Sequence, residues 1–165
     1  IIGILSAVGM VMFGGQAEKA KIAASKANLK TISKWLAVES TKVCSAKQGK
    51  YKNGMYFEDG NSKKFIKCSD EGSNLAYAAS HYFHKNVIFK NPYTGENAIP
   101  DKAISSSFNI TRGGLETVSS SYVKIGEIMF FNLSGEEMAV VFSNIGDKNG
   151  SDKKEWVIIP GPSNF

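Results

Sequence analysis

The chain opens on an apolar run and continues into a long helical pattern. Residues 1–13 contain no charged side chain, and no proline interrupts the stretch from Gln16 to Gln48. Apolar or small residues recur in that stretch at steps of three, four and seven, which indicates one buried stripe on a helix. The stripe comprises Ile22, Ser25, Leu29, Ile32, Leu36 and Val43. A single helix to about residue 48 would be roughly 70 Å long. Such a helix exceeds a domain of this size, so we expect lipid or other subunits to cover its N-terminal half.

The apolar run itself admits three interpretations. A membrane-spanning helix needs about 20 apolar residues, and residues 1–13 are fewer. The run can be a buried core helix, the apolar part of a signal peptide, or the remainder of a spanning segment that starts upstream of Ile1. A signal peptide would carry a basic region first and would begin with Met. We therefore favour the spanning segment whose first residues precede this chain.

Three runs near the C-terminus predict β-strands. They are Lys124–Leu133, Met138–Asn144 and Lys154–Ile159, and the loops between them predict an antiparallel meander. One face of this meander can lie on the C-terminal half of the long helix. A short helix is expected at Asn74–His84.

The expected fold class is therefore α+β, with a long N-terminal α-helix packed against a C-terminal antiparallel β-meander. Residues 1–28 would form a protruding assembly helix, and residues 29–165 one globular head. No composition shift or linker calls for a second domain. The helix residues expected to pack on the head are Leu29, Ile32, Trp35, Leu36 and Val43.

Three segments carry a resemblance to a known family. Residues 1–8, Ile-Ile-Gly-Ile-Leu-Ser-Ala-Val, the following helix at 17–28, and Lys90-Asn91-Pro92-Tyr93 resemble type IV pilins and pseudopilins. The family's processing site, first aromatic residue and early glutamate would lie upstream of Ile1. Val11 stands where many bacterial members have a helix-kinking proline.

The resemblance implies a structural subunit that polymerises through its N-terminal helix into an extracellular type IV pilus filament. The subunit would wait in the inner membrane, where the pilus assembly machinery would take it up, and its main partner would be identical subunits. The alternatives are a minor pilin or a type II secretion pseudopilin and, from another class, a monomeric membrane-anchored surface binding domain. The expected assembly core is Ile1, Ile2, Gly3, Ile4, Leu5, Val8, Val11, Phe13, Gly14, Gly15 and Ile22.

The glycines of the apolar run predict a locally weak helix. Gly3, Gly9, Gly14 and Gly15 each cost roughly 1 kcal/mol relative to alanine in a helix interior. The family resemblance implies that such a stretch often melts in the assembled filament. We therefore expect Gly3–Gly15 to depart from a uniform helix once assembled.

The two cysteines predict one disulfide. In an exported protein an even pair such as Cys44 and Cys68 favours a bridge, here between the end of the long helix and the following loop. His81 and His84 could join them in a zinc site, but no Cys-x-x-Cys is present. Amphipathic helix packing explains the histidines better.

Charge is concentrated on the predicted helix. The chain has a net charge of +5, of which residues 16–52 contribute nine lysines against two glutamates. A nucleic-acid partner is possible on this basis, but Arg112 is the sole arginine and no aromatic–basic stacking pattern is evident. We favour pairing of these lysines with acidic groups on neighbouring heads.

Catalytic and metal-binding chemistry has little support in the sequence. No nucleophile elbow, phosphate-binding loop or dinucleotide fingerprint occurs, so we expect neither an enzyme nor a cofactor. Asp147, Asn149, Ser151 and Asp152 place oxygen ligands as a calcium loop does, without the glycine and the final acidic residue of an EF-hand. A solvated turn is the favoured interpretation of this weak calcium candidate.

Overall fold

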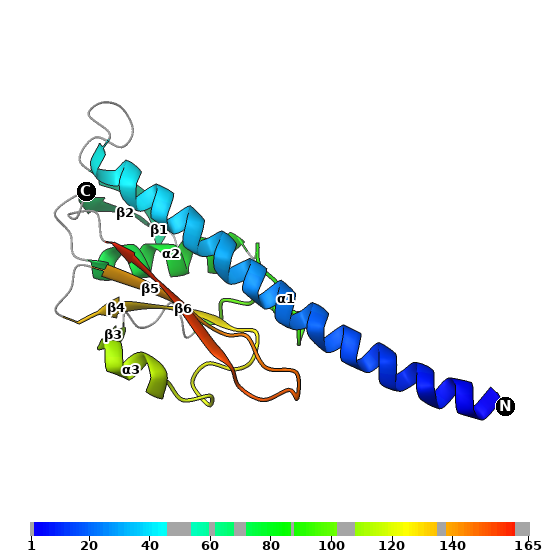
Figure 1. Cartoon of the computed structure of the whole chain (residues 1–165). Helices are drawn as coiled ribbons and strands as arrows, with labels where there is room; N and C mark the ends of the chain where they lie inside the picture. The colour runs from blue at the N-terminus through cyan, green and yellow to red at the C-terminus, as the bar shows by residue number, and fades with distance from the viewer. Residues whose placement is uncertain are drawn as a thin grey trace.

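A computed structural model shows an α+β molecule in which a long helix packs against a small sheet (Figure 1). The structure describes residues 2–45, 54–59, 62–67, 72–86, 88–101, 108–134 and 138–160, and the side chains of 15–41, 76–86, 88–101, 109–134 and 139–160. The elements in chain order are α1 (Ile2–Ser45), β1 (Gly54–Asp59), β2 (Ser62–Lys67), α2 (Gly72–Asn86), β3 (Phe108–Ile110), α3 (Arg112–Thr117), β4 (Ile128–Leu133), β5 (Met138–Asn144) and β6 (Lys154–Pro160).

The main sheet has four strands in the order β3-β4-β5-β6, and it is mixed. β4, β5 and β6 form the expected antiparallel meander, but β3 pairs in parallel with β4, with Phe108 opposite Phe131. The antiparallel meander is therefore confirmed, but the sheet that contains it is mixed, since it includes β3, which was not expected beside the meander. The cause is α3, because this connection lets the chain return so that two consecutive strands run in the same direction. β1 and β2 form a separate hairpin.

The first strand of the meander is shorter than expected. β4 begins at Ile128 rather than at Lys124, because a turn occupies the residues before it. The amide of Glu127 donates to the carbonyl of Lys124 at 3.0 Å, and Gly126 has a φ of 82°. A φ in this range suits glycine and does not continue a strand.

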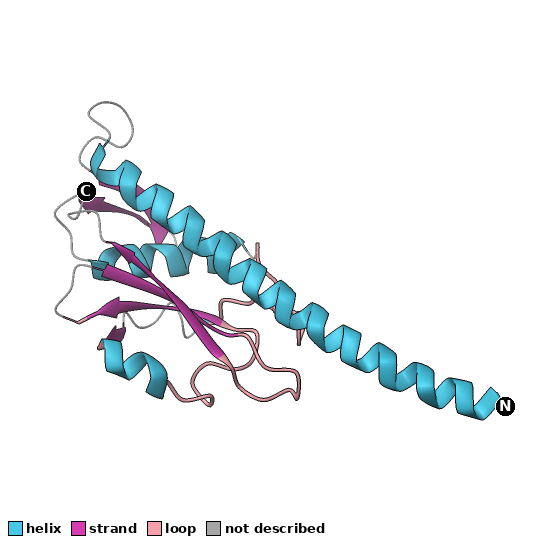
Figure 2. Ribbon diagram, viewed as in Figure 1, coloured by secondary structure: helices cyan, strands magenta, loops and turns pink. Residues whose placement is uncertain are grey.

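The long helix has two parts that differ in their surroundings. Its N-terminal half extends away from the head, whereas its C-terminal half lies along the sheet (Figures 1 and 2). The backbone is helical through Gly3–Gly15 in the single chain; the melting expected in a filament stays a prediction. No helix in the described part of the chain has both the length and the apolar content that a membrane crossing needs.

The core lies where α1 and α2 pack on the sheet. α1 contacts β5 and β6, and α2 contacts β4 and β5. Trp35 joins the two helices, because its ring stacks on Tyr82 at 5.0 Å and meets Phe83 edge-on at 4.8 Å. Aromatic pairs of this geometry add to the stabilisation that apolar burial provides. The head thus holds α1 through an aromatic and aliphatic core.

Candidate functional site

The surface of α1 changes character at Ser25. No side chain from Gly15 to Ala24 is buried, whereas buried positions recur every three to four residues from Ser25 to Ser40. Among the expected assembly residues, Gly15 is exposed with open space around it, and Ile22 is half-buried. Ile1 and the side chains of residues 2–14 lie outside the described parts of the structure.

The residues expected to pack on the head lie against it. Leu29, Ile32 and Leu36 are buried in the core, and Trp35 packs at its edge. The side chain of Val43 lies outside the described residues. Full burial of a leucine or isoleucine contributes roughly 1.5–3 kcal/mol, so this stripe supplies much of the attachment between helix and head.

The loop that contains Asn91-Pro92-Tyr93 closes around a buried amide. Asn91 is 3% exposed. Its Nδ2 donates to the carbonyl of Ile125 at 3.0 Å, and its Oδ1 accepts from the amide of Tyr93 at 2.8 Å. The backbone closes the same loop, because the amide of Gly95 donates to the carbonyl of Asn91 at 2.8 Å. Both ends of the amide are satisfied, which fixes the loop against the turn before β4.

Two glycines leave room for this loop. A Cβ at Gly126 would collide with the Asn91 side chain, and one at Gly146 would lie 2.6 Å from the hydroxyl of Tyr93. Both glycines also have positive φ angles, 82° and 70°. The sequence gives no local signal for these roles, because the clashing partners lie more than thirty residues away along the chain.

Tyr93 connects the loop to the helix at the point where the helix leaves the head. Its hydroxyl donates to the carbonyl of Ile145 at 2.8 Å, and the ammonium of Lys21 lies 5.3 Å from the centre of its ring. Burial, with the nearby Glu18 carboxylate adding to it, raises the pKa of Tyr93 to about 12. Asn28 adds a second link, since its Nδ2 donates to the carbonyl of Lys90 at 3.1 Å. We call Glu18, Lys21, Asn28, Asn91 and Tyr93 the junction.

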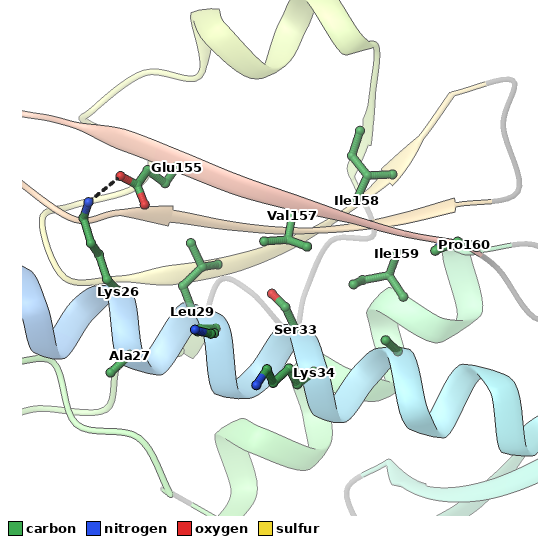
Figure 3. A pocket seen from close by; sticks show the side chains of 12 residues that line it. Lys26, Ala27, Leu29, Ser33, Lys34, Glu155, Val157, Ile158, Ile159 and Pro160 are labelled. Carbon is green, nitrogen blue, oxygen red and sulfur yellow. Dashed lines mark ion pairs between the residues drawn. The ribbon is translucent and has the colours of Figure 1, made fainter.

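A groove lies beside the junction, between α1 and β6 (Figure 3). It has a volume of about 730 Å³ and is lined mainly by apolar side chains. Lys26 pairs with Glu155 at 3.0 Å at one end, and the hydroxyl of Ser40 donates to the carbonyl of Pro160 at 2.8 Å beyond the other. A groove of this volume falls within the usual range of ligand sites.

The calcium candidate closes on its own backbone. Oδ1 of Asp147 accepts from the amides of Asn149 and Ser151, both at 2.8 Å. Hydrogen bonds from Ser120 and then Asn144 lower the pKa of the Asp152 carboxyl. Among the described residues no group of three or more histidine, cysteine, aspartate or glutamate side chains is placed to hold a metal ion. The loop hydrogen bonds therefore direct two backbone amides at one carboxylate oxygen of Asp147.

The remaining candidates are the histidines of the zinc alternative and the expected disulfide. His84 faces the carbonyl of Ile99 through Nδ1 at 2.7 Å and the carboxylate of Asp101 through Nε2 at 2.9 Å, so a local network holds its ring. The expected disulfide lies outside the described parts, because neither the side chain of Cys44 nor residue 68 is among them. The bridge between Cys44 and Cys68 stays a prediction.

Comparison of the chain with protein-family models, with curated proteins and with solved structures finds no match.

Proposed function

We propose that this protein is a structural subunit that polymerises through its N-terminal helix into an extracellular filament of the type IV pilus kind. The observation that carries the proposal is the division of α1. The helix has 44 residues, but side chains become buried against the head only from Ser25 onward. The half that the head leaves uncovered begins with the uncharged run at 1–13.

The physical argument concerns what can cover that half. Apolar surface removed from water contributes roughly 25 cal/mol per Å², so an uncharged rod is stabilised most when other apolar surfaces surround it. Rods of identical subunits, packed side by side, provide such surfaces in a filament. The small residues of the run favour close approach between helices. A lipid bilayer would cover the same segment before assembly, which fits an inner-membrane precursor.

The resemblance to type IV pilins supports the same proposal from the sequence. It brings together the N-terminal segment and the Asn91-Pro92-Tyr93 loop, and this loop contacts α1 where the helix leaves the head. The lysines exposed on α1, such as Lys19 and Lys30, would face acidic groups of neighbouring heads. Cell adhesion and motility are among the tasks such a filament could serve.

Electron microscopy of the purified full chain tests the proposal, with two lysine variants as a matched pair. We expect helical filaments from the native chain and from Thr94→Lys, which adds a charge at an exposed position of the head. We expect none from Val8→Lys, because a charge in the apolar run would have to be buried in the filament core. Unchanged thermal unfolding of the head in Val8→Lys would show that the loss concerns assembly.

The alternatives give other outcomes in the same experiment. Filaments that form only when other pilin-like subunits are supplied would favour a minor pilin or a pseudopilin. A chain that stays monomeric at all concentrations would favour a membrane-anchored surface domain. Filaments of normal length from Val8→Lys would contradict assembly through this helix.

A further inference from the structure

The groove between α1 and β6 lies between two contacts that join the helix to the strand. At one end Lys26 and Glu155 form an ion pair at 3.0 Å, and at the other Ser40 binds the carbonyl of Pro160 at 2.8 Å. Between these two contacts the groove is lined mainly by apolar side chains of the helix and the strand. Figure 3 shows Ser33 and Val157 facing each other across this middle part.

β6 borders the groove with its free edge. No described strand pairs with the side of β6 that faces away from β5. The consecutive residues Val157, Ile158, Ile159 and Pro160 all line the groove. Side chains alternate between the two faces of a sheet, and Figure 3 shows the side chain of Ile158 directed away from α1, so Ile158 borders the groove with its backbone at the edge of the strand.

The hydrogen-bond pattern shows which backbone groups point to that edge. The amide of Ile145 donates to the carbonyl of Lys153, just before the paired register of β5 and β6 begins. Because bonded and non-bonded pairs alternate in an antiparallel ladder, Trp156, Ile158 and Pro160 direct their backbone groups away from β5. The contact from Ser40 to the carbonyl of Pro160 agrees with this alternation. The backbone groups of Ile158 therefore face the groove.

The helix side of the groove adds one buried donor and two cations. Ser33 is 5% exposed, and its hydroxyl has no hydrogen-bond partner. Lys30 and Lys34 line the groove on exposed positions, and no described carboxylate pairs with either. Glu155, the acidic residue on the strand side, is already paired with Lys26. An occupant with negative charge toward the helix is thus complementary to this wall.

We propose that the groove binds an extended peptide segment in trans, in which acidic and apolar residues alternate. The segment would add a strand to the free edge of β6 and exchange backbone hydrogen bonds with Ile158. Its acidic side chains, all on one face, would meet Lys30, Lys34 and the hydroxyl of Ser33. The span from Glu155 to Pro160 accepts about five residues at roughly 3.3 Å each. This inference does not depend on filament assembly.

Hydrogen exchange of the full chain in mild detergent tests the strand addition. The probe is a blocked peptide of sequence Val-Glu-Val-Glu-Val. In the free chain the amide of Ile158 should exchange fast, because it lies on an open edge, and saturating peptide should slow its exchange. The same peptide methylated on its backbone nitrogens should protect the amide of Ile158 much less, since it cannot donate to the carbonyl of Ile158 and its methyl groups obstruct pairing with β6. Protection of Ile158 before any peptide is added would overturn the proposal.

Fluorescence anisotropy with a labelled peptide tests the charges. Lys30→Glu with Lys34→Glu should weaken binding roughly tenfold or more. Lys19→Glu with Lys148→Glu makes the same charge change at exposed positions that do not line the groove, and should change affinity much less. An equal loss of peptide affinity in both double variants would mean that the peptide responds only to the net charge of the protein. That result would overturn the assigned site.

Ser33→Ala separates binding from folding. The variant should bind the peptide several times more weakly, while its thermal stability should stay the same or rise, because an unsatisfied buried hydroxyl is removed. Unchanged affinity would exclude Ser33 from the site. Protection of Ile158 that grows with protein concentration alone would place a second copy of this chain in the groove and overturn the peptide assignment.

Discussion

Two segments of α1 differ both in their apolar residues and in their surroundings. Ile22 is the one large apolar residue from Gly15 to Ala24, whereas the segment from Ser25 to Ser40 contains Leu29, Ile32, Trp35, Leu36 and Val38. The first has no buried side chain, and the second is held by the core, by the hydrogen bond from Ser40 and by the ion pair of Lys26. Both segments are helical, so the apolar stripe rather than the secondary structure distinguishes them. Tertiary packing decides which half belongs to the head, and the junction marks the boundary.

The largest effect is expected where the second half enters the core. Leu36→Ala should lower the free energy of unfolding by about 2–4 kcal/mol, because Leu36 is 1% exposed and leaves a cavity. Val38→Ala on the same turn should cost less than about 0.5 kcal/mol, since Val38 is 52% exposed. Urea unfolding followed by circular dichroism measures both. Similar losses in the two variants would contradict the burial of this face of α1.

A smaller effect is expected at the glycine that supports the junction. Gly126→Ala should cost about 2–3 kcal/mol, because the new Cβ adopts an unfavourable φ and displaces the buried Asn91 side chain. Gly113→Ala is the matched control, since nothing lies within 4 Å of its Cβ position. Thermal unfolding of the two variants checks this. If Gly113→Ala were the more destabilised, the close approach at Gly126 would be unimportant.

Tyr93→Phe should lower the free energy of unfolding by about 1–2 kcal/mol, because the carbonyl of Ile145 loses its donor. The native chain should also lose stability as the pH rises from about 10 toward 12. The folded state holds the Tyr93 proton up to about pH 12, whereas the unfolded chain releases it near the ordinary pKa of 10.0. The difference in unfolding free energy between the native chain and the variant should therefore be smaller at pH 11 than at pH 9. A constant difference across this range would refute the raised pKa.

The smallest effect is expected at Lys21, the charge that lies over the ring of Tyr93. Lys21→Gln should lower stability by about 0.5–1 kcal/mol, and added salt should reduce the difference. Lys19→Gln removes a charge from an exposed position two residues earlier and serves as the control. Chemical denaturation at low and high salt measures both. Identical behaviour of the two variants would mean that the head exerts no hold on α1 at this point.

The elements with strong periodicity could be predicted from the sequence. The long helix, the short helix near Asn74–His84 and the three meander strands all occur with boundaries shifted by a few residues. β3 and α3 could not be predicted, because a strand of three residues carries too little alternation and its parallel partner is chosen by tertiary packing. The residues between 97 and 121 are rich in serine, threonine and glycine, which hides both elements.

Of the candidate sites, those that depend on local sequence could be predicted, and those that depend on distant segments could not. Leu29, Ile32 and Leu36 form a helical stripe in the sequence, and the structure places all three in the core. The supporting roles of Gly126 and Gly146 depend on side chains that approach from distant segments, so no local pattern announces them. The groove depends on how α1 and β6 diverge between two contacts. The sequence of either segment alone therefore does not predict the groove.

The way α1 lies on the head has a mechanical consequence. The attached part from Ser25 to Ser40 runs along the sheet for about 22 Å, and its buried leucine and isoleucine side chains all belong to one core. A pull along the helix axis loads these contacts in shear, so many of them must yield together. A sideways pull on the extended half peels them one after another, beginning at Tyr93 and Lys21. The subunit should therefore resist tension along its rod far better than bending at the point where the rod leaves the head.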